Sequence, residues 1–282
     1  MKRKIVLLGA TILLAGTLAM GCGSKEEAKT EDTKTEESAK TDDAKEESEW
    51  QYVSADEALK AAKAGETHIL DVREWDNYVE GRLINSQWCP IFPLEDESLV
   101  EKMTTYAKDK LMDGKEIYIV CNSGQRGAQK ATGVLEDAGI DKDLIYTVEG
   151  GAKALAKMKN ALTTSRVDEN IDWQYAEAKD VIADKDAQII DVRDDENFEA
   201  GHLAGSLHSD LTDVEDVKLQ KSLVEMSNDL DPAKPVYFMC YSGNKCAKTG
   251  VSLLQDAGFK ADQLFIIKDG AKGADAKAAF EK

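Results

Sequence analysis

The chain has few of the residues that build metal sites, disulfide frameworks and nucleic-acid-binding surfaces. It contains three histidines and five cysteines in 282 residues, which is too few for a disulfide scaffold or a histidine-based metal site. Acidic residues outnumber basic residues by 54 to 36, giving a net charge of −18. This charge makes nucleic acid and anionic membrane surfaces poor partners. Because hydrophobic residues still form 42% of the chain, we expect packed domains. No cysteine–histidine cluster has the spacing of metal ligands, so we expect no metal, and we expect no cofactor.

A long hydrophobic segment is also missing. The longest run, Ile5–Met20, has 16 residues, whereas a membrane-spanning helix needs about 20. Basic residues before the run and small residues after it are typical of a secretory signal peptide. The run ends in LAMGC at Cys22, which resembles the lipobox of bacterial lipoproteins. That resemblance implies that residues 1–21 are a signal peptide and that Cys22 carries lipid, so the protein is extracytoplasmic and lipid-anchored to the bacterial cell membrane. The alternative is ordinary cleavage nearby with Cys22 unmodified.

Residues 22–49 lack the apolar side chains that a folded segment needs. Between residues 24 and 49 there are 11 acidic residues, five lysines and no aliphatic side chain larger than alanine. Such a segment cannot bury enough apolar surface to offset the entropy of ordering the chain. We therefore expect residues 22–49 to form a lipidated cysteine followed by a disordered acidic linker.

The rest of the chain repeats itself. The segment HILDVREWDNYVEGRL is followed 120 residues later by QIIDVRDDENFEAGHL, and IYIVCNSGQRGAQKATGVLEDAGI is followed 119 residues later by VYFMCYSGNKCAKTGVSLLQDAGF. The small drift in offset corresponds to short gaps between two copies of one domain. We refer to residues 50–163 as repeat 1 and to residues 170–282 as repeat 2, with the boundary near residues 163–170.

Each repeat alternates short apolar runs with longer helical patterns. In repeat 1, Ser54 and Glu57 form a capping-box signature ahead of a helix. The expected helices are 55–64, 96–110 and 127–138, and the expected strands are His68–Val72, Ile117–Val120 and Leu144–Val148, with Gln188–Val192, Val236–Met239 and Leu264–Ile267 in repeat 2. Near-continuous apolar strands separated by helices predict a parallel sheet covered on both faces. The expected fold class is α/β, with two tandem domains, each a small parallel sheet flanked by helices.

A cysteine follows one buried strand in each repeat. Cys121 comes directly after IYIV and Cys240 directly after VYFM, and each begins a short polar loop that leads into a helix. Ligands of open parallel sheets bind at the carboxyl ends of the strands. Backbone N–H groups of such a loop, together with a helix N-terminus, stabilise a thiolate or an incoming anion.

Three motifs, in the same order in both repeats, resemble the rhodanese family. The first runs from DVR at Asp71 to Leu83, and from DVR at Asp191 to Leu203, like the family's DVR, EF and GHI segment. The second is the cysteine loop, which is close to the family's CRSGxRS. The third is the glycine segment after the last strand, at Gly150-Gly151 and at Gly270. The resemblance covers residues 50–282 and identifies the chain as a tandem rhodanese-like protein.

The resemblance implies that Cys121 and Cys240 are catalytic in a thiosulfate sulfurtransferase. Each would take sulfur from a small sulfur donor, thiosulfate or a persulfide, as a cysteine persulfide and pass it to a thiol or cyanide-like acceptor, which is covalent catalysis in two steps. The rest of each loop would bind the substrate; its residues are Asn122, Ser123, Gly124, Gln125, Arg126, Tyr241, Ser242, Gly243, Asn244 and Lys245. Arginine can hold an oxyanion with two donors, whereas lysine acts as a point charge. Repeat 1 is slightly closer to the family pattern, and the sequence identifies no protein partner.

Loop length separates this interpretation from cysteine-based phosphatases and related arsenate reductases. Those enzymes have five residues between the cysteine and the arginine, whereas both loops here have four residues before the cation. The shorter loop suits a single sulfur atom and crowds a phosphate. Two other hypotheses stay open: a noncatalytic sulfur-binding or sensing module on the cell surface, and a thiol–disulfide redox protein.

The redox hypothesis depends on Cys246, which stands at the start of a helix where repeat 1 has Gly127. Cys246 is either a resolving or regulatory thiol that forms a disulfide with Cys240, or a small residue without chemistry.

Cys89 is expected to be buried and structural. The acidic and basic residues of the two DVR motifs are expected to fix the end of the strand, and His202 to be hydrogen-bonded scaffolding, whereas the sequence suggests no partner for His208.

Overall fold

The computed structural model describes residues 50–282. The predicted signal peptide, the lipidation site Cys22 and the acidic linker lie outside the described residues. Both repeats fall within one compact unit. Among residues 50–282, no helix is long and apolar enough to cross a membrane.

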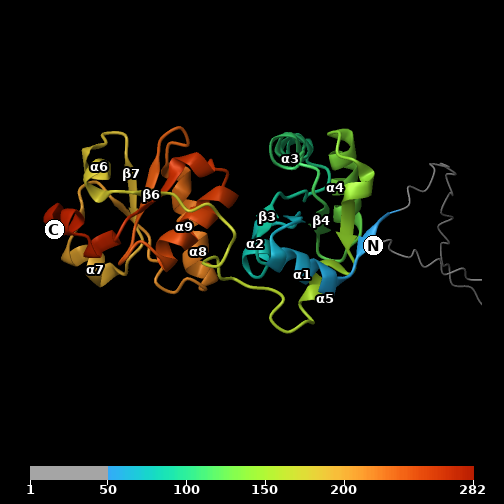
Figure 1. The fold of residues 1–282 in the computed structure, drawn as a ribbon, viewed down its shortest axis with the longest axis horizontal. Coiled ribbons are helices and arrows are strands. Elements are labelled where there is room, and N and C mark those ends of the chain that lie inside the picture. Colours follow the sequence, from blue (N-terminus) through green and yellow to red (C-terminus); the bar gives the residue numbers. More distant parts are fainter. Residues whose placement is uncertain (1–49) are drawn as a thin grey trace, which may run out of the picture. The chain divides into compact units, whose positions relative to one another are not determined.

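Repeat 1 contains a five-stranded parallel sheet with the strand order β1-β5-β4-β2-β3. Strands β3 and β4 of this sheet are labelled in Figure 1. Strand β4 lies at the centre of the sheet, so the residue that follows it lies at the middle of the sheet's carboxyl edge. The strands are β1 (Tyr52–Val53), β2 (His68–Asp71), β3 (Ser86–Trp88), β4 (Ile117–Val120) and β5 (Ile145–Val148).

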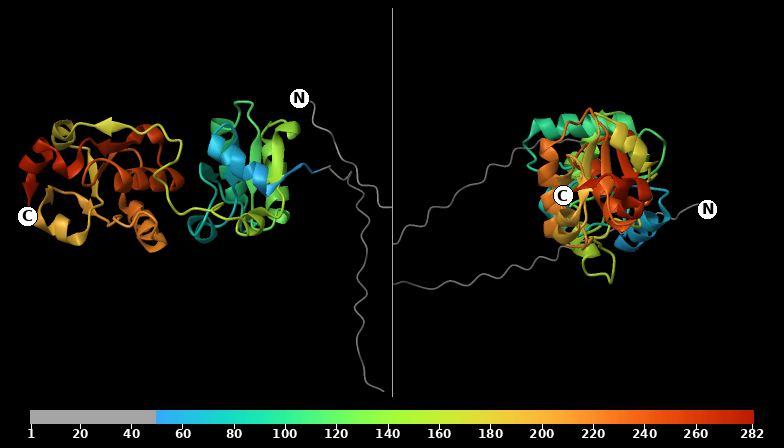
Figure 2. Two further views of the ribbon diagram at one scale, coloured as in Figure 1. Left: turned by 60° about the horizontal axis from the view of Figure 1, so that its bottom comes forward. Right: turned by 90° about the vertical axis from the view of Figure 1, so that its left-hand side faces the viewer.

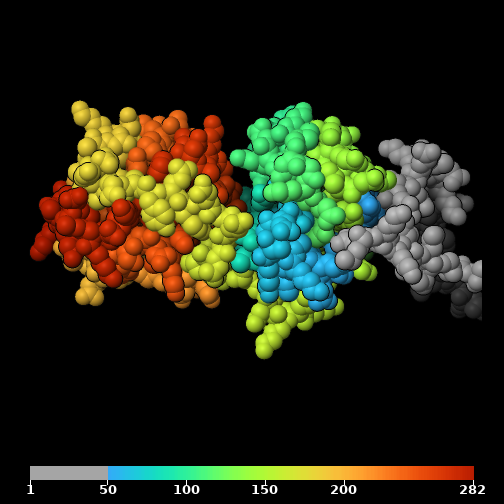
Figure 3. Space-filling model, viewed as in Figure 1, coloured from blue at the N-terminus to red at the C-terminus, as the bar shows by residue number. Residues whose placement is uncertain are grey.

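Helices cover both faces of this sheet. Side chains from α3 and α4 pack with Leu70, Ile117 and Ile119 on one face, and side chains from α1 and α5 pack with Ile69 and Val120 on the other. The outer face of α1, drawn in blue, is open to solvent in Figure 3. The helices are α1 (Ala55–Ala64), α2 (Trp75–Val79), α3 (Glu97–Lys110), α4 (Arg126–Asp137) and α5 (Gly151–Leu155), with η1 (Lys142–Leu144) before β5.

Repeat 2 has the same architecture. Its parallel sheet has the order β6-β11-β10-β7-β9, again with the strand before the cysteine at the centre. Figure 2 shows its layers from two further directions. A small antiparallel pair, β8 with β12, is added at the C-terminus. The strands are β6 (Tyr175–Ala176), β7 (Gln188–Asp191), β8 (His202–Leu203), β9 (Leu207–His208), β10 (Val236–Met239), β11 (Leu264–Ile267) and β12 (Phe280–Glu281).

The helices of repeat 2 are divided between the two faces in the same way. Side chains from α8 and α9 form one core cluster with Ile190 and Phe238, and side chains from α6 and α10 form the other with Ile189 and Met239. The helices are α6 (Ala178–Ala183), α7 (Asp195–Ala200), α8 (Val217–Met226), α9 (Lys245–Asp256) and α10 (Ala274–Ala278), with η2 (Ser227–Asp229), η3 (Ala261–Gln263) and η4 (Gly270–Lys272). The predicted α/β fold is confirmed in both repeats.

Two charged residues of the segment between the repeats, Arg166 and Glu169, are buried. Arg166 is 1% exposed, and its guanidinium donates to Asp256 at 2.5 Å and to Ser252 at 3.0 Å. Glu169 accepts hydrogen bonds from Arg82 of repeat 1 and from Ser252 of repeat 2. We call these five residues the interrepeat cluster. The sequence analysis located the boundary here but did not predict that charged side chains would join the two repeats.

Candidate functional site

The cysteine loops lie where the sequence predicted them, at the carboxyl ends of the central strands. Cys121 follows the last residue of β4, and α4 begins five positions later at Arg126. Cys240 follows β10, and α9 begins at Lys245. Both cysteines are 2% exposed. The structure therefore brings all the predicted substrate-binding residues of a repeat into one strand-to-helix turn.

The glycine segment after β5 holds the loop of repeat 1 from outside. The Ala152 N–H donates to the carbonyl oxygen of Cys121 at 2.8 Å, and the Lys153 N–H donates to the carbonyl oxygen of Asn122 at 3.1 Å. A Cβ atom on Gly151 would lie 2.2 Å from that same Cys121 oxygen. The absence of a side chain at Gly151 is thus what permits this close approach. These two hydrogen bonds fix the outer side of the loop to the glycine segment.

Repeat 2 reproduces this arrangement. The Ala271 N–H donates to the Cys240 carbonyl oxygen at 2.7 Å, and a Cβ on Gly270 would again lie 2.2 Å from it. The backbone angles also match: φ is 66° at Gly124 and 65° at Gly243, and the following residues have φ −129°, ψ −126° and φ −136°, ψ −124°. The two loops therefore share one backbone conformation.

A backbone donor contacts the thiol of the second loop, and a helix begins next to each cysteine loop. The Asn244 N–H donates to the Cys240 Sγ at 3.3 Å. Helices α4 and α9, each 12 residues long, start at the end of the loops, so the positive end of each helix dipole faces the sulfur. Arg126 and Lys245 are exposed at the helix starts, where an incoming anion can reach them. A strand-to-helix turn of this kind offers backbone N–H groups to an anion.

Comparison with known proteins assigns this architecture. The profile of the Rhodanese-like domain family matches residues 54–158 and 174–277. The chain belongs to the rhodanese-like family. Each repeat is one rhodanese-like domain, and the tandem arrangement predicted from the sequence is confirmed.

The curated relatives include sulfurtransferases. Over 86 residues the chain is 34% identical to the thiosulfate sulfurtransferase GlpE of Coxiella burnetii, an alignment that covers 30% of this chain and 71% of the relative. Similar solved structures include a thiosulfate sulfurtransferase from Pseudomonas aeruginosa, with 15% identity, a TM-score of 0.37 and coverage of 78% of this chain and 41% of that one. Another is SseA from Escherichia coli, described as a 3-mercaptopyruvate sulfotransferase, with 19% identity, a TM-score of 0.34 and coverage of 79% and 98%. The family and the curated relatives support a sulfurtransferase-type function.

The charged pairs of the DVR motifs are structural in both rhodanese-like domains, as predicted. Arg73 donates to the Asp71 carboxylate and, at 2.8 Å, to the Gly81 carbonyl oxygen. Its counterpart Arg193 joins Asp191 to the carbonyl oxygen of Gly201 at 2.7 Å. Both pairs are buried, and they fasten the end of the strand to the following turn.

His202 and His208 are held by hydrogen bonds, and Cys89 is buried. His202 makes the expected scaffolding hydrogen bond, 3.0 Å between Nδ1 and the Phe198 oxygen. His208, for which the sequence suggested no partner, lies 2.8 Å from the carbonyl oxygen of Arg193 and stacks on Phe198 at a centroid distance of 4.3 Å. Burial raises the pKa of Cys89 to about 12, which makes its thiol unreactive at neutral pH. The prediction of a structural Cys89 is confirmed.

One difference between the domains adjoins the cysteine. In the second domain, the Tyr241 hydroxyl donates to the Asp194 carboxylate at the N-terminus of α7. Hydrogen bonding from Tyr241 and then from Asn197 lowers the pKa of Asp194 to about 2. The first domain has Asn122 at the equivalent position. The Tyr241 side chain thus anchors the second loop to α7.

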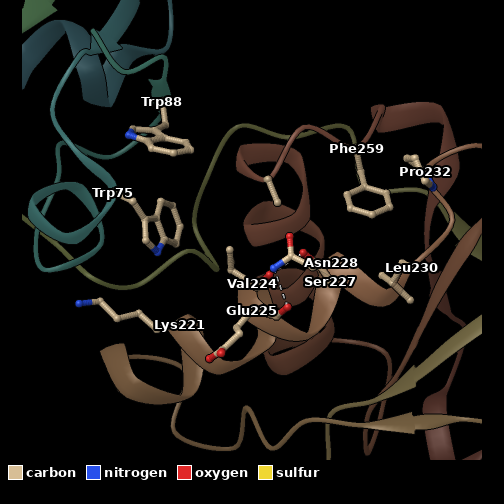
Figure 4. Close-up of a pocket in the computed structure, with 11 residues that line it drawn as sticks. Trp75, Trp88, Lys221, Val224, Glu225, Ser227, Asn228, Leu230, Pro232 and Phe259 are labelled. Carbon is tan, nitrogen blue, oxygen red and sulfur yellow. Dashed lines mark hydrogen bonds between the residues drawn. The ribbon is translucent and has the colours of Figure 1, made fainter. Parts of the chain in front are cut away.

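One cavity lies apart from both cysteine loops. It has a volume of about 620 Å³ and is lined by Trp75 and Trp88 of the first domain and by residues of the second domain that include Val224, Glu225 and Phe259 (Figure 4). No loop residue lines it. Within residues 50–282, no group of three or more histidine, cysteine or acidic side chains is placed to hold a metal ion. The cysteine turns are therefore the sites to which chemistry can be assigned.

Proposed function

We propose that the protein is a sulfurtransferase that moves sulfane sulfur from thiosulfate or a persulfide donor to a thiophilic acceptor through a cysteine persulfide. The observation that carries this proposal is the matched pair of turns at Cys121 and Cys240. In each turn the loop carbonyls accept hydrogen bonds from the glycine segment outside, so the N–H groups and the helix N-terminus are left for an anionic sulfur.

The first half-reaction loads the cysteine. The thiolate attacks the outer sulfur of thiosulfate, a new S–S bond forms at Cys121 or Cys240, and sulfite leaves with the electron pair of the broken S–S bond. Arg126 or Lys245 attracts the anionic donor to the turn. The loop N–H groups then hold the negative charge of the persulfide in place of a histidine or metal.

The second half-reaction removes the transferred sulfur from the cysteine. A nucleophilic acceptor attacks the outer sulfur of the persulfide, and the cysteine leaves as the thiolate that began the cycle. Cyanide would give thiocyanate, and a thiol would give a new persulfide. The small size of the turn and the low exposure of both cysteines, 2%, favour a small donor and a slender acceptor.

The test is thiocyanate formation from thiosulfate and cyanide by the full chain. Wild type is compared with Cys121→Ser, Cys240→Ser and the double variant. We expect activity in the wild type and none in the double variant. Loss in one single variant would identify the working domain, and loss only in the double would show that both work. An inactive reduced wild type that also gains no sulfur by mass spectrometry would overturn the proposal in favour of a binding module.

We further propose that the protein acts outside the cytoplasm, attached to the bacterial membrane by lipid on Cys22. The support is sequence alone: a basic start, a 16-residue apolar run and the LAMGC ending. A single acyl chain anchors only marginally, so stable attachment requires more than one. Labelling cells with an alkyne fatty acid should mark the wild type but not Cys22→Ala. Equal labelling, or none in either, would contradict the proposal.

A further inference from the structure

The second domain differs from the first at two neighbouring positions beside the catalytic cysteine. In the first domain, the residue after Arg126 is Gly127, and a Cβ added there would meet the Phe92 ring at 2.5 Å and the Cys121 Cβ at 3.3 Å. The Phe92 ring thus occupies the space that a side chain at Gly127 would need. A side chain at position 127 would therefore require the Phe92 ring to move.

In the second domain both positions have changed together. Cys246 stands where the first domain has Gly127, and Thr212 stands where it has Phe92; the strand registers Asp71 with Trp88 and Asp191 with His208 fix this equivalence. The Thr212 hydroxyl donates to the Asp210 carboxylate at 2.6 Å. The smaller threonine leaves room for a side chain at the start of α9, and a cysteine fills it.

The shared loop conformation determines where Cys246 lies. Because the two turns have nearly the same backbone angles, the 3.3 Å between the hypothetical Gly127 Cβ and the Cys121 Cβ also approximates the separation of the Cys246 and Cys240 Cβ atoms. Disulfides span Cβ atoms about 3.5–4.5 Å apart, so a shift of a few tenths of an ångström is sufficient. Cys246 is half-buried and packs against the cluster that contains Cys240, and both thiols are free.

We propose that Cys246 is a resolving thiol for the Cys240 persulfide. This inference rests on the proposed sulfur transfer at Cys240. The Cys246 Sγ attacks the Cys240 Sγ, a Cys240–Cys246 disulfide forms, and the bond to the outer sulfur breaks. The outer sulfur leaves with that electron pair and, with the proton from Cys246, forms hydrosulfide. The sulfane sulfur is reduced and Cys246 is oxidised; an external dithiol must reopen the disulfide before another cycle.

The environment of Cys246 determines when this step occurs. Burial, followed by the nearby charges of Cys240 and Asp210, raises the pKa of Cys246 to about 11, and Lys245 acts in the opposite direction. The thiol is therefore protonated at neutral pH, so it does not compete with Cys240 for the donor. Disulfide closure should accelerate as the pH rises from neutral toward that pKa.

The first domain provides the matched comparison. With Gly127 beside it, Cys121 has no neighbouring thiol in the turn, so its persulfide must wait for an external acceptor. The second domain can instead release its sulfur as sulfide without one. Two loops of similar backbone conformation but with different neighbours would thus give one chain two fates for a transferred sulfur atom.

The experiment follows a single turnover of the reduced full chain with thiosulfate and no acceptor. We expect the Cys121→Ser protein to release about one sulfide per chain and to gain a Cys240–Cys246 disulfide, found by peptide mass spectrometry after alkylation. The Cys121→Ser/Cys246→Ser protein should retain a persulfide on Cys240 and release no sulfide. The matched Cys240→Ser protein should likewise retain its persulfide on Cys121.

The outcomes separate this inference from the function on which it rests. A stable Cys240 persulfide both with and without Cys246 would overturn the resolving role and leave sulfur transfer intact. No sulfur on Cys240 in either protein would overturn both at this domain. In the Cys240→Ser background, Gly127→Cys together with Phe92→Thr should confer sulfide release on the first domain.

Discussion

Gly151 shows how a single residue positions the reactive turn. Its backbone has φ of 55°, a conformation that costs a residue with a side chain about 1–2 kcal/mol. A Cβ there would also lie 2.7 Å from the Gly124 nitrogen and 2.9 Å from the Ser123 nitrogen. The two glycines therefore meet backbone to backbone, and the position of Cys121 depends on that contact. The structural role of the glycine segment was not apparent from its sequence, which marked only its place after the last strand.

We predict that Gly151→Ala inactivates the first domain. In a Cys240→Ser background, displacement of the loop by about 1 Å should lower thiocyanate formation on the order of 100-fold, with a loss of stability from the strained backbone. Gly133→Ala is the control, because a Cβ on Gly133 in α4 meets no atom within 4 Å. That variant should keep its activity and gain about 0.5–1 kcal/mol in the free energy of unfolding. Full activity in Gly151→Ala would contradict this account of the turn.

Secondary-structure elements vary in how visible they were in the sequence. Helix α1, its capping box and the strands β4, β10 and β11 have the predicted bounds, because their apolar runs and caps are local signals. The edge strands β1 and β6 contain two residues each, too few for an alternating pattern to be visible, and they were missed. The positions of Phe92 and Thr212 beside the helix starts also went unnoticed, because only the folded chain brings them next to Gly127 and Cys246.

The capping box of α1 provides a test at this scale. The Ser54 side chain accepts from the Glu57 N–H at 3.2 Å, and Glu57 accepts in return from Ser54. We predict that Ser54→Ala lowers the free energy of unfolding by about 1 kcal/mol, measured by urea denaturation. Glu57→Gln should lose much less, since glutamine also serves in a capping box. Equal losses in the two variants would mean that charge, not capping, dominates at this helix start.

At the scale of the whole molecule, the interrepeat cluster is the feature that no sequence pattern indicated. Arg82 is 1% exposed and Glu169 is 9% exposed, yet arginine and glutamate in a polar segment are ordinarily surface residues. Arg166 also lies over the rings of Trp75 and Tyr78, at 5.9 and 5.6 Å from their centroids. The partners of Arg82, Arg166 and Glu169 are distant in the sequence, so no local pattern could indicate these contacts.

We predict that Glu169→Ala destabilises the protein by about 3–5 kcal/mol, because it leaves the buried Arg82 guanidinium without its carboxylate. Thermal unfolding of the full chain measures the loss. Lys221→Ala is the control: its 2.6 Å ion pair with Asp76 also joins the repeats but is largely exposed, with Asp76 77% exposed. An exposed pair contributes at most about 1 kcal/mol. Similar losses in the two variants would show that burial does not govern the strength of this junction.

The interrepeat cluster also decides how the protein can be divided. A fragment of residues 50–163 would contain Arg82 without Glu169, and a fragment of residues 170–282 would contain Asp256 and Ser252 without Arg166. Each half would thus carry polar groups whose partners had been left on the other side of the cut. A fragment of either domain that includes the segment between the repeats is therefore a better starting point for expression than a fragment cut at the end of the repeat. A duplication evident in the sequence need not correspond to domains that fold separately.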